Sequence, residues 1–221
     1  MNIEAFIITN GRSTYTYCSE SIREQTMELK FRTISNKRWV EALGECFLSC
    51  NSDFFLRVDD DFILHPRAVE FMWERMCILK NVDKLGMFFS HLWEDWTEKR
   101  VAGIKIYSVK ALDAIRGFKV DKFGKVDKVT NEVLEKAGFL LVKDVSAVGL
   151  HSCGAWEEQL EYERLWSELA GFDYKKSTHE EMKNYDKPLE EQYRMRLDWL
   201  ENKNKVLRTP FGKFLERKRY E

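Results

Sequence analysis

The chain has 221 residues, of which 44% are hydrophobic and 33% are charged, and its formal net charge is −1. This composition is ordinary for a folded globular protein, so it excludes a disordered tail protein and a membrane bundle, and the near-neutral charge gives no global reason to expect a nucleic-acid partner. No apolar run approaches the roughly 20 residues that cross a bilayer, and the opening residues predict a strand rather than a signal peptide. We therefore expect a cytoplasmic enzyme.

The first sixty residues predict an alternation of strands and helices. Residues 3–9 are apolar and β-rich and stop at an Asn-Gly turn, which suits a buried central strand. Residues 15–25 suit a helix, and residues 29–34 alternate apolar with polar side chains as a second strand does. The apolar side chains of residues 39–50 fall on one face of a helix, and residues 54–58 form a short apolar strand.

The alternation continues to residue 144. Pro66 can be the first residue of a helix, because that position needs no backbone N–H. Further elements are predicted as helices at residues 66–79, 109–115 and 128–137, and as strands at residues 85–89, 103–107 and 139–144. Such an order predicts an α/β fold with a Rossmann-like, mostly parallel sheet flanked by helices, whose ligand lies beyond the carboxyl ends of the strands.

The chain divides into two predicted parts. A catalytic domain is expected over residues 1–154, and a helical C-terminal extension over residues 155–221. The extension carries two apolar stripes at helical spacing and is expected to form two amphipathic helices. Its basic end, KFLERKRYE, is expected to make at most a weak contact with an anionic surface, since a basic tail is more often a solvated helix end.

Three consecutive acids, Asp59, Asp60 and Asp61, follow the strand predicted at residues 54–58. Carboxylates in a row repel one another, and apolar neighbours desolvate them, so a positive group should compensate them. A hard divalent cation, Mn²⁺ or Mg²⁺, is the simplest compensator. Because side chains alternate along a strand, Asp59 and Asp61 are expected to point one way and Asp60 the other. An acidic loop that caps a helix N-terminus is the alternative.

Two segments resemble motifs of the inverting family 2 glycosyltransferases, which have the GT-A fold. IITNGRSTYTYCSESIREQT is similar to that family's opening strand, nucleotide-contacting turn and first helix, and DFFLRVDDDFILHPRAVEFM is similar to its Asp-x-Asp motif and proline helix. The resemblance implies a GT-A domain whose first half binds the nucleotide and whose second half binds the acceptor. It also implies a set of residues that contact the donor, namely Thr9, Asn10, Arg12, Asp59 and Asp60.

The same resemblance implies a metal site and a catalytic base. Asp61 would ligate the metal, and Asp59 would complete the metal shell or approach the nucleotide ribose. RGFKVDKFGKVDKVTNEVLEKAGFLLVKDVSAVGLH is similar to the family's acidic motif, helix, glycine, strand and terminal histidine. By that match Asp127 is the base, and His151 is a ligand of the metal or of the donor diphosphate.

Alternatives stay open for both of these residues. Val126 stands where the family has Glu, which leaves Asp121 and Glu132 as substitute bases. Asp127 could instead be a helix N-cap, a position that Asp fills well. His151 could be a structural histidine with ordinary hydrogen bonds.

The resemblance implies a transferase that moves one sugar from a nucleotide sugar, expected to be a UDP-sugar, to an acceptor hydroxyl with inversion. The acceptor is a glycan, a lipid, a protein or a modified nucleic-acid base, and the sequence does not identify it. Processive synthases of this superfamily carry a Gln-x-x-Arg-Trp motif that the chain lacks, so single-sugar transfer is expected. The alternatives are a glycosyltransferase that acts on modified bases in DNA, a nucleotidyltransferase, and a non-catalytic GT-A-like binding protein.

Overall fold

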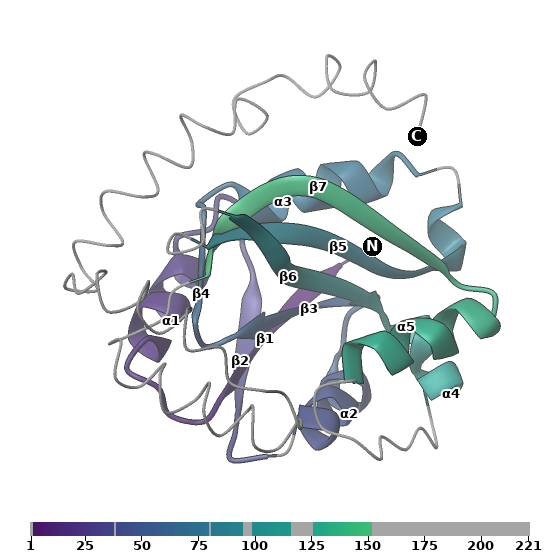
Figure 1. Cartoon of the computed structure of the whole chain (residues 1–221), viewed down its shortest axis with the longest axis horizontal. Helices are drawn as coiled ribbons and strands as arrows, with labels where there is room; N and C mark the ends of the chain where they lie inside the picture. The colour runs from purple at the N-terminus through teal and green to yellow at the C-terminus, as the bar shows by residue number, and fades with distance from the viewer. Residues whose placement is uncertain (1, 38, 80, 95–98, 116–125, 152–221) are drawn as a thin grey trace.

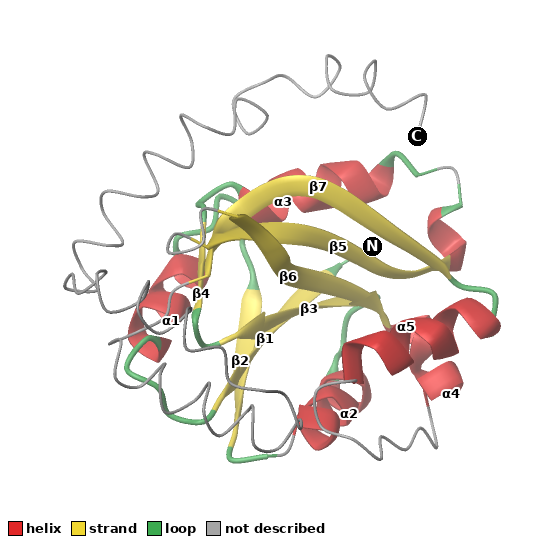
Figure 2. Ribbon diagram, viewed as in Figure 1, coloured by secondary structure: helices red, strands yellow, loops and turns green. Residues whose placement is uncertain are grey.

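The computed structural model describes residues 2–37, 39–79, 81–94, 99–115 and 126–151. These residues form a seven-stranded sheet, in the order β2-β1-β3-β6-β5-β7-β4, with helices on both faces (Figures 1 and 2). The strands are β1 (Ile3–Thr9), β2 (Lys30–Ser35), β3 (Phe54–Asp59), β4 (Phe62–Leu64), β5 (Leu85–Glu94), β6 (Lys99–Ser108) and β7 (Leu140–His151). The helices are α1 (Tyr15–Arg23), α2 (Trp39–Ser49), α3 (Ala68–Cys77), α4 (Leu112–Ile115) and α5 (Val126–Lys136), with short 3-10 helices η1 (Val82–Lys84) and η2 (Val109–Ala111).

The first half of the chain forms the parallel part of the sheet. β1 pairs in parallel with both β2 and β3, and the helices α1 and α2 connect these strands. Such connections are expected, because parallel neighbours need a crossover that spans the length of the sheet. The carboxyl ends of β1 and β3 therefore lie side by side, and the turns that follow them share one edge of the sheet.

The whole sheet is mixed, so the prediction of a mostly parallel sheet is wrong in this respect. In the described residues three strand pairings are parallel, and three are antiparallel: β3 with β6, β5 with β6, and β4 with β7. The segment that connects β5 to β6 has only four residues, 95–98. A connection this short joins antiparallel neighbours.

Strand β4 was not predicted, because three apolar residues carry no periodic signal. It follows the acids directly and pairs antiparallel with the end of β7, so that Phe62 lies opposite His151 and Leu64 opposite Gly149. This register brings His151, ninety residues later in the chain, next to Asp61. The close approach needs a glycine, since a Cβ built on Gly149 would lie 2.5 Å from the carbonyl oxygen of Ile63.

Two apolar clusters occupy the two faces of the sheet. Side chains of β1 alternate between them, with Ile7 on one face and Phe6 on the other. Helices α1 and α3 cover the first face through side chains such as Ile22 and Met72, and α2 and α5 cover the second. Figure 1 shows α3 on one side of the curled sheet and α2, α4 and α5 on the other. The core thus fixes the sheet between two helical layers.

Most predicted elements are present, with shifted ends. Helix α3 begins at Ala68 rather than at Pro66, which lies in the preceding turn, and β5, β6 and β7 are longer than predicted. The segment predicted as a helix at residues 109–115 divides into η2 and α4. Gly138, with φ +83°, follows the end of α5 as expected of a helix C-terminus. The predicted extension, residues 155–221, lies outside the described residues, as does the boundary at 154.

Within the described segments, no helix combines the length and the apolar character that a membrane span requires.

The contact between β4 and β7 leads to a stability prediction. Gly149→Ala places a methyl group against the β4 backbone, so we expect the variant to lose about 1–3 kcal/mol of unfolding free energy, as overpacked sites do. The control is Gly44→Ala, where a Cβ meets nothing within 4 Å inside α2. This control should gain about 0.5–1 kcal/mol from helix propensity. Urea denaturation of the two variants measures both values, and equal stabilities would contradict the assigned pairing.

Candidate functional site

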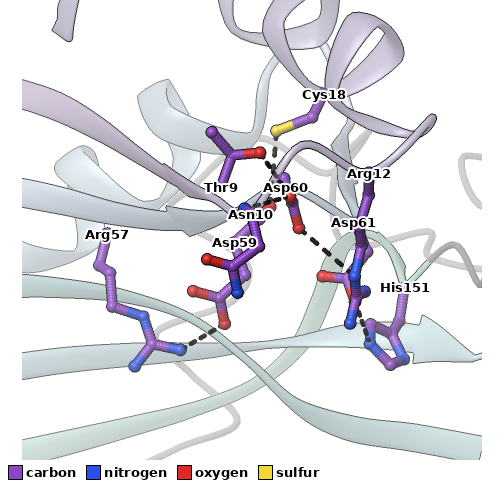
Figure 3. Close-up of polar contacts among 9 residues, drawn as sticks. All are labelled: Thr9, Asn10, Arg12, Cys18, Arg57, Asp59, Asp60, Asp61 and His151. Carbon is purple, nitrogen blue, oxygen red and sulfur yellow. Dashed lines mark hydrogen bonds and ion pairs between the residues drawn. The ribbon is translucent and has the colours of Figure 1, made fainter. Parts of the chain in front are cut away.

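The three acids lie where β3 ends. Asp59 is the last residue of β3, and Asp60 and Asp61 form the turn into β4. The predicted strand alternation therefore stops at Asp59, and the expectation that Asp59 and Asp61 act as a pair on one side is wrong. Figure 3 shows Asp59 directed toward Arg57, and Asp61 directed toward Arg12 and His151. Each acid thus has a different environment.

Asp60 holds the turn between β1 and α1. Its Oδ2 accepts hydrogen bonds from the Thr9 hydroxyl at 2.6 Å and from the Asn10 backbone N–H at 3.2 Å (Figure 3). The Gly11 N–H donates to the Thr9 hydroxyl at 2.9 Å, and Gly11 adopts φ +86°, a conformation that favours glycine. Burial raises the pKa of Asp60, and the Asp61 charge adds to this, against the opposing effects of Thr9 and Arg12.

The structure therefore brings together the residues predicted to contact the nucleotide. Thr9 and Asn10 lie against Asp60, and the Arg12 guanidinium lies 3.8 Å from the Asp60 carboxylate. Strand pleating would turn the Asp60 side chain away from the site. Asp60 lies after the end of the strand, however, and its side chain points to the β1–α1 turn. Its observed role is to fix the turn in place.

Two nitrogen-bearing side chains approach the same oxygen of Asp61, the Arg12 guanidinium and the His151 imidazole. Asp61 Oδ2 lies 2.5 Å from Arg12 NH1 and 3.3 Å from His151 Nε2 (Figure 3). The Asp61 side chain is only 9% exposed, and burial alone would raise its pKa. The interactions with His151 and Arg12 outweigh this effect and lower the pKa of Asp61 to about 2. Asp61 is therefore an ionised, buried carboxylate.

A second cluster of charged side chains lies beside Asp59, on the face of the sheet that α5 covers. Arg57 NH2 lies 2.7 Å from Asp59 Oδ2, and Arg57 NH1 lies 3.2 Å from Asp127 Oδ1. Lys105, opposite Arg57 in the β3–β6 register, lies 2.5 Å from Asp127 Oδ2. The Arg57 and Lys105 side chains are each 5% exposed. We call Arg57, Asp59, Lys105 and Asp127 the charge network.

Sequence reasoning missed the two cations of this network. Arg57 had a signal, because it is the one charged residue within the apolar run FFLRV and stands two positions before Asp59, on the same face of β3. Lys105 had a weaker signal. It lies inside an apolar strand, but its partners come from β3 and α5, far away in the sequence. Charged residues are rarely this buried unless they are paired.

Asp127 lies in the first turn of α5, as the second residue of the helix, so the alternative of an N-cap does not describe it. Burial opposes ionisation of Asp127, but the charges of Arg57 and Lys105 and their hydrogen bonds lower its pKa below the ordinary value. Burial lowers the pKa of Lys105 to about 8, and the nearby Arg57 acts in the same direction. The Asp127 side chain is 47% exposed, so one side of this carboxylate faces solvent.

The protein itself compensates the three acids: Arg57 for Asp59, Arg12 for Asp60 and Asp61, and His151 for Asp61. In the described part of the chain no group of three or more His, Cys, Asp or Glu side chains is arranged to hold a metal. The Asp61 carboxylate and the His151 imidazole are nevertheless a two-ligand set. A Mn²⁺ or Mg²⁺ ion bound there would take its remaining oxygen ligands from phosphate and water, as Mg²⁺ commonly does.

Asp59 keeps one buried oxygen, Oδ1, without a hydrogen-bond partner among the described residues. Buried polar atoms are rarely left in this state, because an unmade hydrogen bond costs free energy. The oxygen is suited to accept a hydrogen bond from a ligand hydroxyl. Asp59 thus keeps an acceptor atom that the described residues do not satisfy.

The charge network leads to a second stability prediction. Asp127→Asn leaves Lys105 with less compensation, so we expect it to lower the unfolding free energy by about 1–2 kcal/mol, less than the 3–5 kcal/mol of a fully buried pair because Asp127 is half exposed. In a protein that already carries Lys105→Met, the Asp127→Asn change should lower the unfolding free energy by less. Glu135→Gln, at an exposed acid of the same helix, is the control and should change stability by under about 0.5 kcal/mol.

The same variant has a predicted pH dependence. The pKa of Asp127 is lowered in the folded protein, so its ion pairs contribute stability above the ordinary carboxyl pKa and lose it as the pH falls through the lowered value. The stability difference between the native protein and Asp127→Asn should therefore be constant near pH 7 and shrink below about pH 4. Denaturation at several pH values measures it, and a difference independent of pH would argue against the ion pairs.

No protein-family model matches the chain, and no curated protein matches it. Solved structures do match. A mannosyltransferase from Pyrobaculum calidifontis in complex with GDP-mannose and Mn²⁺ aligns with a TM-score of 0.55 and 10% identity, over 74% of this chain and 60% of that one. A CMP:2-keto-3-deoxy-manno-octonic acid synthetase in complex with CTP aligns with a TM-score of 0.51 and 12% identity, over 77% of this chain and 99% of that one.

These likenesses establish the fold. The chain has the α/β architecture common to GT-A glycosyltransferases and nucleotidyltransferases, and the predicted fold class is confirmed. At 10% and 12% identity the likenesses say nothing of which reaction the chain performs. That question depends on the site.

Proposed function

We propose that the chain is a metal-dependent, inverting glycosyltransferase that moves a single sugar from a nucleotide sugar to an acceptor hydroxyl. The observation that carries the proposal is the contact between Asp61 and His151, 3.3 Å apart, beside the Thr9–Arg12 turn at the carboxyl ends of β1 and β3. In open α/β sheets, ligands bind at such an edge. A carboxylate and an imidazole placed next to this turn suit a cation that bridges to a diphosphate.

Asp61 and His151 would hold the Mn²⁺ or Mg²⁺ ion, which when bound supplies positive charge to the departing diphosphate. Two features support this assignment. Asp61 is already ionised, so this carboxylate does not have to lose a proton before a cation binds. The mannosyltransferase that shares the fold is in complex with a nucleotide sugar and Mn²⁺.

The donor would bind against the β1–α1 turn. Asp60 fixes the Thr9 and Asn10 positions, so the turn is ordered before the nucleotide arrives. The unpartnered Asp59 Oδ1 would accept a hydrogen bond from a ribose hydroxyl. A UDP-sugar is the proposed donor. The turn contains a single glycine, Gly11, whereas a nucleotidyltransferase normally carries a glycine-rich phosphate loop. This difference favours glycosyl transfer over nucleotidyl transfer.

Asp127 would act as the base. Its carboxylate is ionised and half exposed, so an acceptor hydroxyl can approach it. The hydroxyl proton passes to Asp127 as the oxygen attacks the anomeric carbon, and the bond between that carbon and the diphosphate oxygen breaks. Arg57 contacts both Asp59 and Asp127, so it holds the donor-side acid and the base at a fixed separation. Attack from the face opposite the leaving group inverts the anomer.

One assay tests the reaction class. The protein is incubated with Mn²⁺ and a panel of nucleotide sugars and nucleoside triphosphates, and slow hydrolysis and thermal stabilisation are measured. We expect hydrolysis of a nucleotide sugar to the nucleoside diphosphate and the free sugar. Release of pyrophosphate from a triphosphate would instead show a nucleotidyltransferase, and stabilisation without turnover would show a binding protein. A salt-sensitive shift on DNA would favour the modified-base alternative for the acceptor.

Site variants test the assigned roles. Asp61→Ala should abolish the Mn²⁺-dependent activity, and Asp127→Asn should lower transfer by about 10²–10⁴-fold, the usual contribution of a general base. Circular dichroism should show both variants folded. Glu135→Gln, which changes an exposed acid on the same helix as Asp127, is the matched control and should keep full activity. Near-normal activity in either site variant removes that residue from its role.

A further inference from the structure

Arg12 lies where a cation bound to the acids would lie. Its NH1 contacts Asp61 Oδ2 at 2.5 Å, and its Nε lies 3.8 Å from Asp60 Oδ1 (Figure 3). The Arg12 side chain is 16% exposed, whereas Arg57, the other arginine among the acids, is 5% exposed. Arg12 is therefore the more accessible of the two compensating arginines, and it comes from a turn rather than from the centre of a strand.

The contact with Asp61 conflicts with metal binding at the same atom. His151 Nε2 and Arg12 NH1 both approach Asp61 Oδ2, so a divalent ion held by Asp61 and His151 would meet the guanidinium at close range. Like charges this close, in a site of low exposure, repel strongly. Arg12 has to withdraw from this oxygen when the ion binds.

The donor offers Arg12 a new partner. A diphosphate bound to an ion on Asp61 would lie within reach of Arg12, and a guanidinium binds phosphate oxygens with paired hydrogen bonds. The backbone of Arg12 is held in place meanwhile, since its carbonyl accepts a hydrogen bond from the Tyr15 N–H at 3.1 Å. Only the side chain has to move. The exchange keeps Arg12 paired with an anion before and after binding.

We propose that Arg12 occupies the place of the divalent cation on Asp61 in the donor-free protein and moves to the donor diphosphate when the ion binds. The inference rests on the proposed function for the metal site. Its consequence is that the ion alone binds weakly, because it has to displace Arg12, and that the ion and the nucleotide assist each other's binding. Such coupling is reciprocal. Free metal would then seldom occupy the site without a donor.

The test measures two affinities in the same variants. Binding of Mn²⁺ alone is followed by the electron paramagnetic resonance of the free ion, and binding of UDP, GDP and CDP is followed by calorimetry in excess Mn²⁺. Arg12→Ala should bind Mn²⁺ at least about five-fold more tightly than the native protein, because the competing cation is gone. It should bind the nucleoside diphosphate at least about ten-fold more weakly, because the phosphate contact is gone.

The opposite signs separate this role from a structural one, since damage to the turn would weaken both affinities. Arg32→Ala is the matched control: it removes the same charge from a pair with Glu4, at the other end of β1, and should change neither affinity by more than about two-fold.

Three outcomes overturn the exchange. If Arg12→Ala binds Mn²⁺ no more tightly while Asp61→Ala loses the ion, the metal site stands and the inference fails. If Arg12→Ala gains Mn²⁺ affinity but keeps the nucleoside diphosphate, the transfer to the donor fails. If neither the native protein nor Arg12→Ala binds Mn²⁺, or none of the three nucleotides binds, the proposed donor site fails and takes the inference with it.

Discussion

The turn that carries Asp59, Asp60 and Asp61 is largely buried, and every carboxylate in it has to be compensated by groups from other parts of the chain. That constraint organises this edge of the sheet. Asp60 ties the β3 turn to the Thr9–Asn10 turn after β1. Asp61 is approached by Arg12 from the β1–α1 turn and by His151 from the end of β7. The charged side chains that pair with one another at this edge are also the groups that, in the proposed function, would contact a metal and a nucleotide.

The compensating groups differ in how firmly they are fixed. Arg57 and Lys105 stand inside strands and join β3, β6 and α5, so their charges stay in place once the core has formed. They keep Asp127 ionised, at the cost of a lower basicity. Arg12 stands on a turn, and its side chain is the one that the proposed exchange would move from one anion to another. The site thus combines a part fixed within strands beside Asp127 with a part on a turn beside Asp61.

Most elements were predictable from the sequence because they are local. The apolar pattern of β1 and β3 and the helical stripe of α2 depend only on neighbouring residues. The same holds for the prediction that the acids stand at the end of a strand. The position of His151 was predicted only through a family resemblance. Strand β4 was missed because it exists through its pairing with β7, and the mixed sheet was missed because pattern alone does not give strand direction.

The sequence by itself determined an α/β fold, the order of most of its strands and helices, and a group of acids that needs positive charge, since periodicity and local chemistry carry that information. Only the tertiary structure decided how each acid of the turn is compensated. Asp59, Asp60 and Asp61 are adjacent in the chain but lie where a strand becomes a turn, and their partners come from β1, β3, α1's preceding turn and β7. Three neighbouring and identical side chains therefore acquire different roles, because the field around a carboxylate is set by residues far away in sequence.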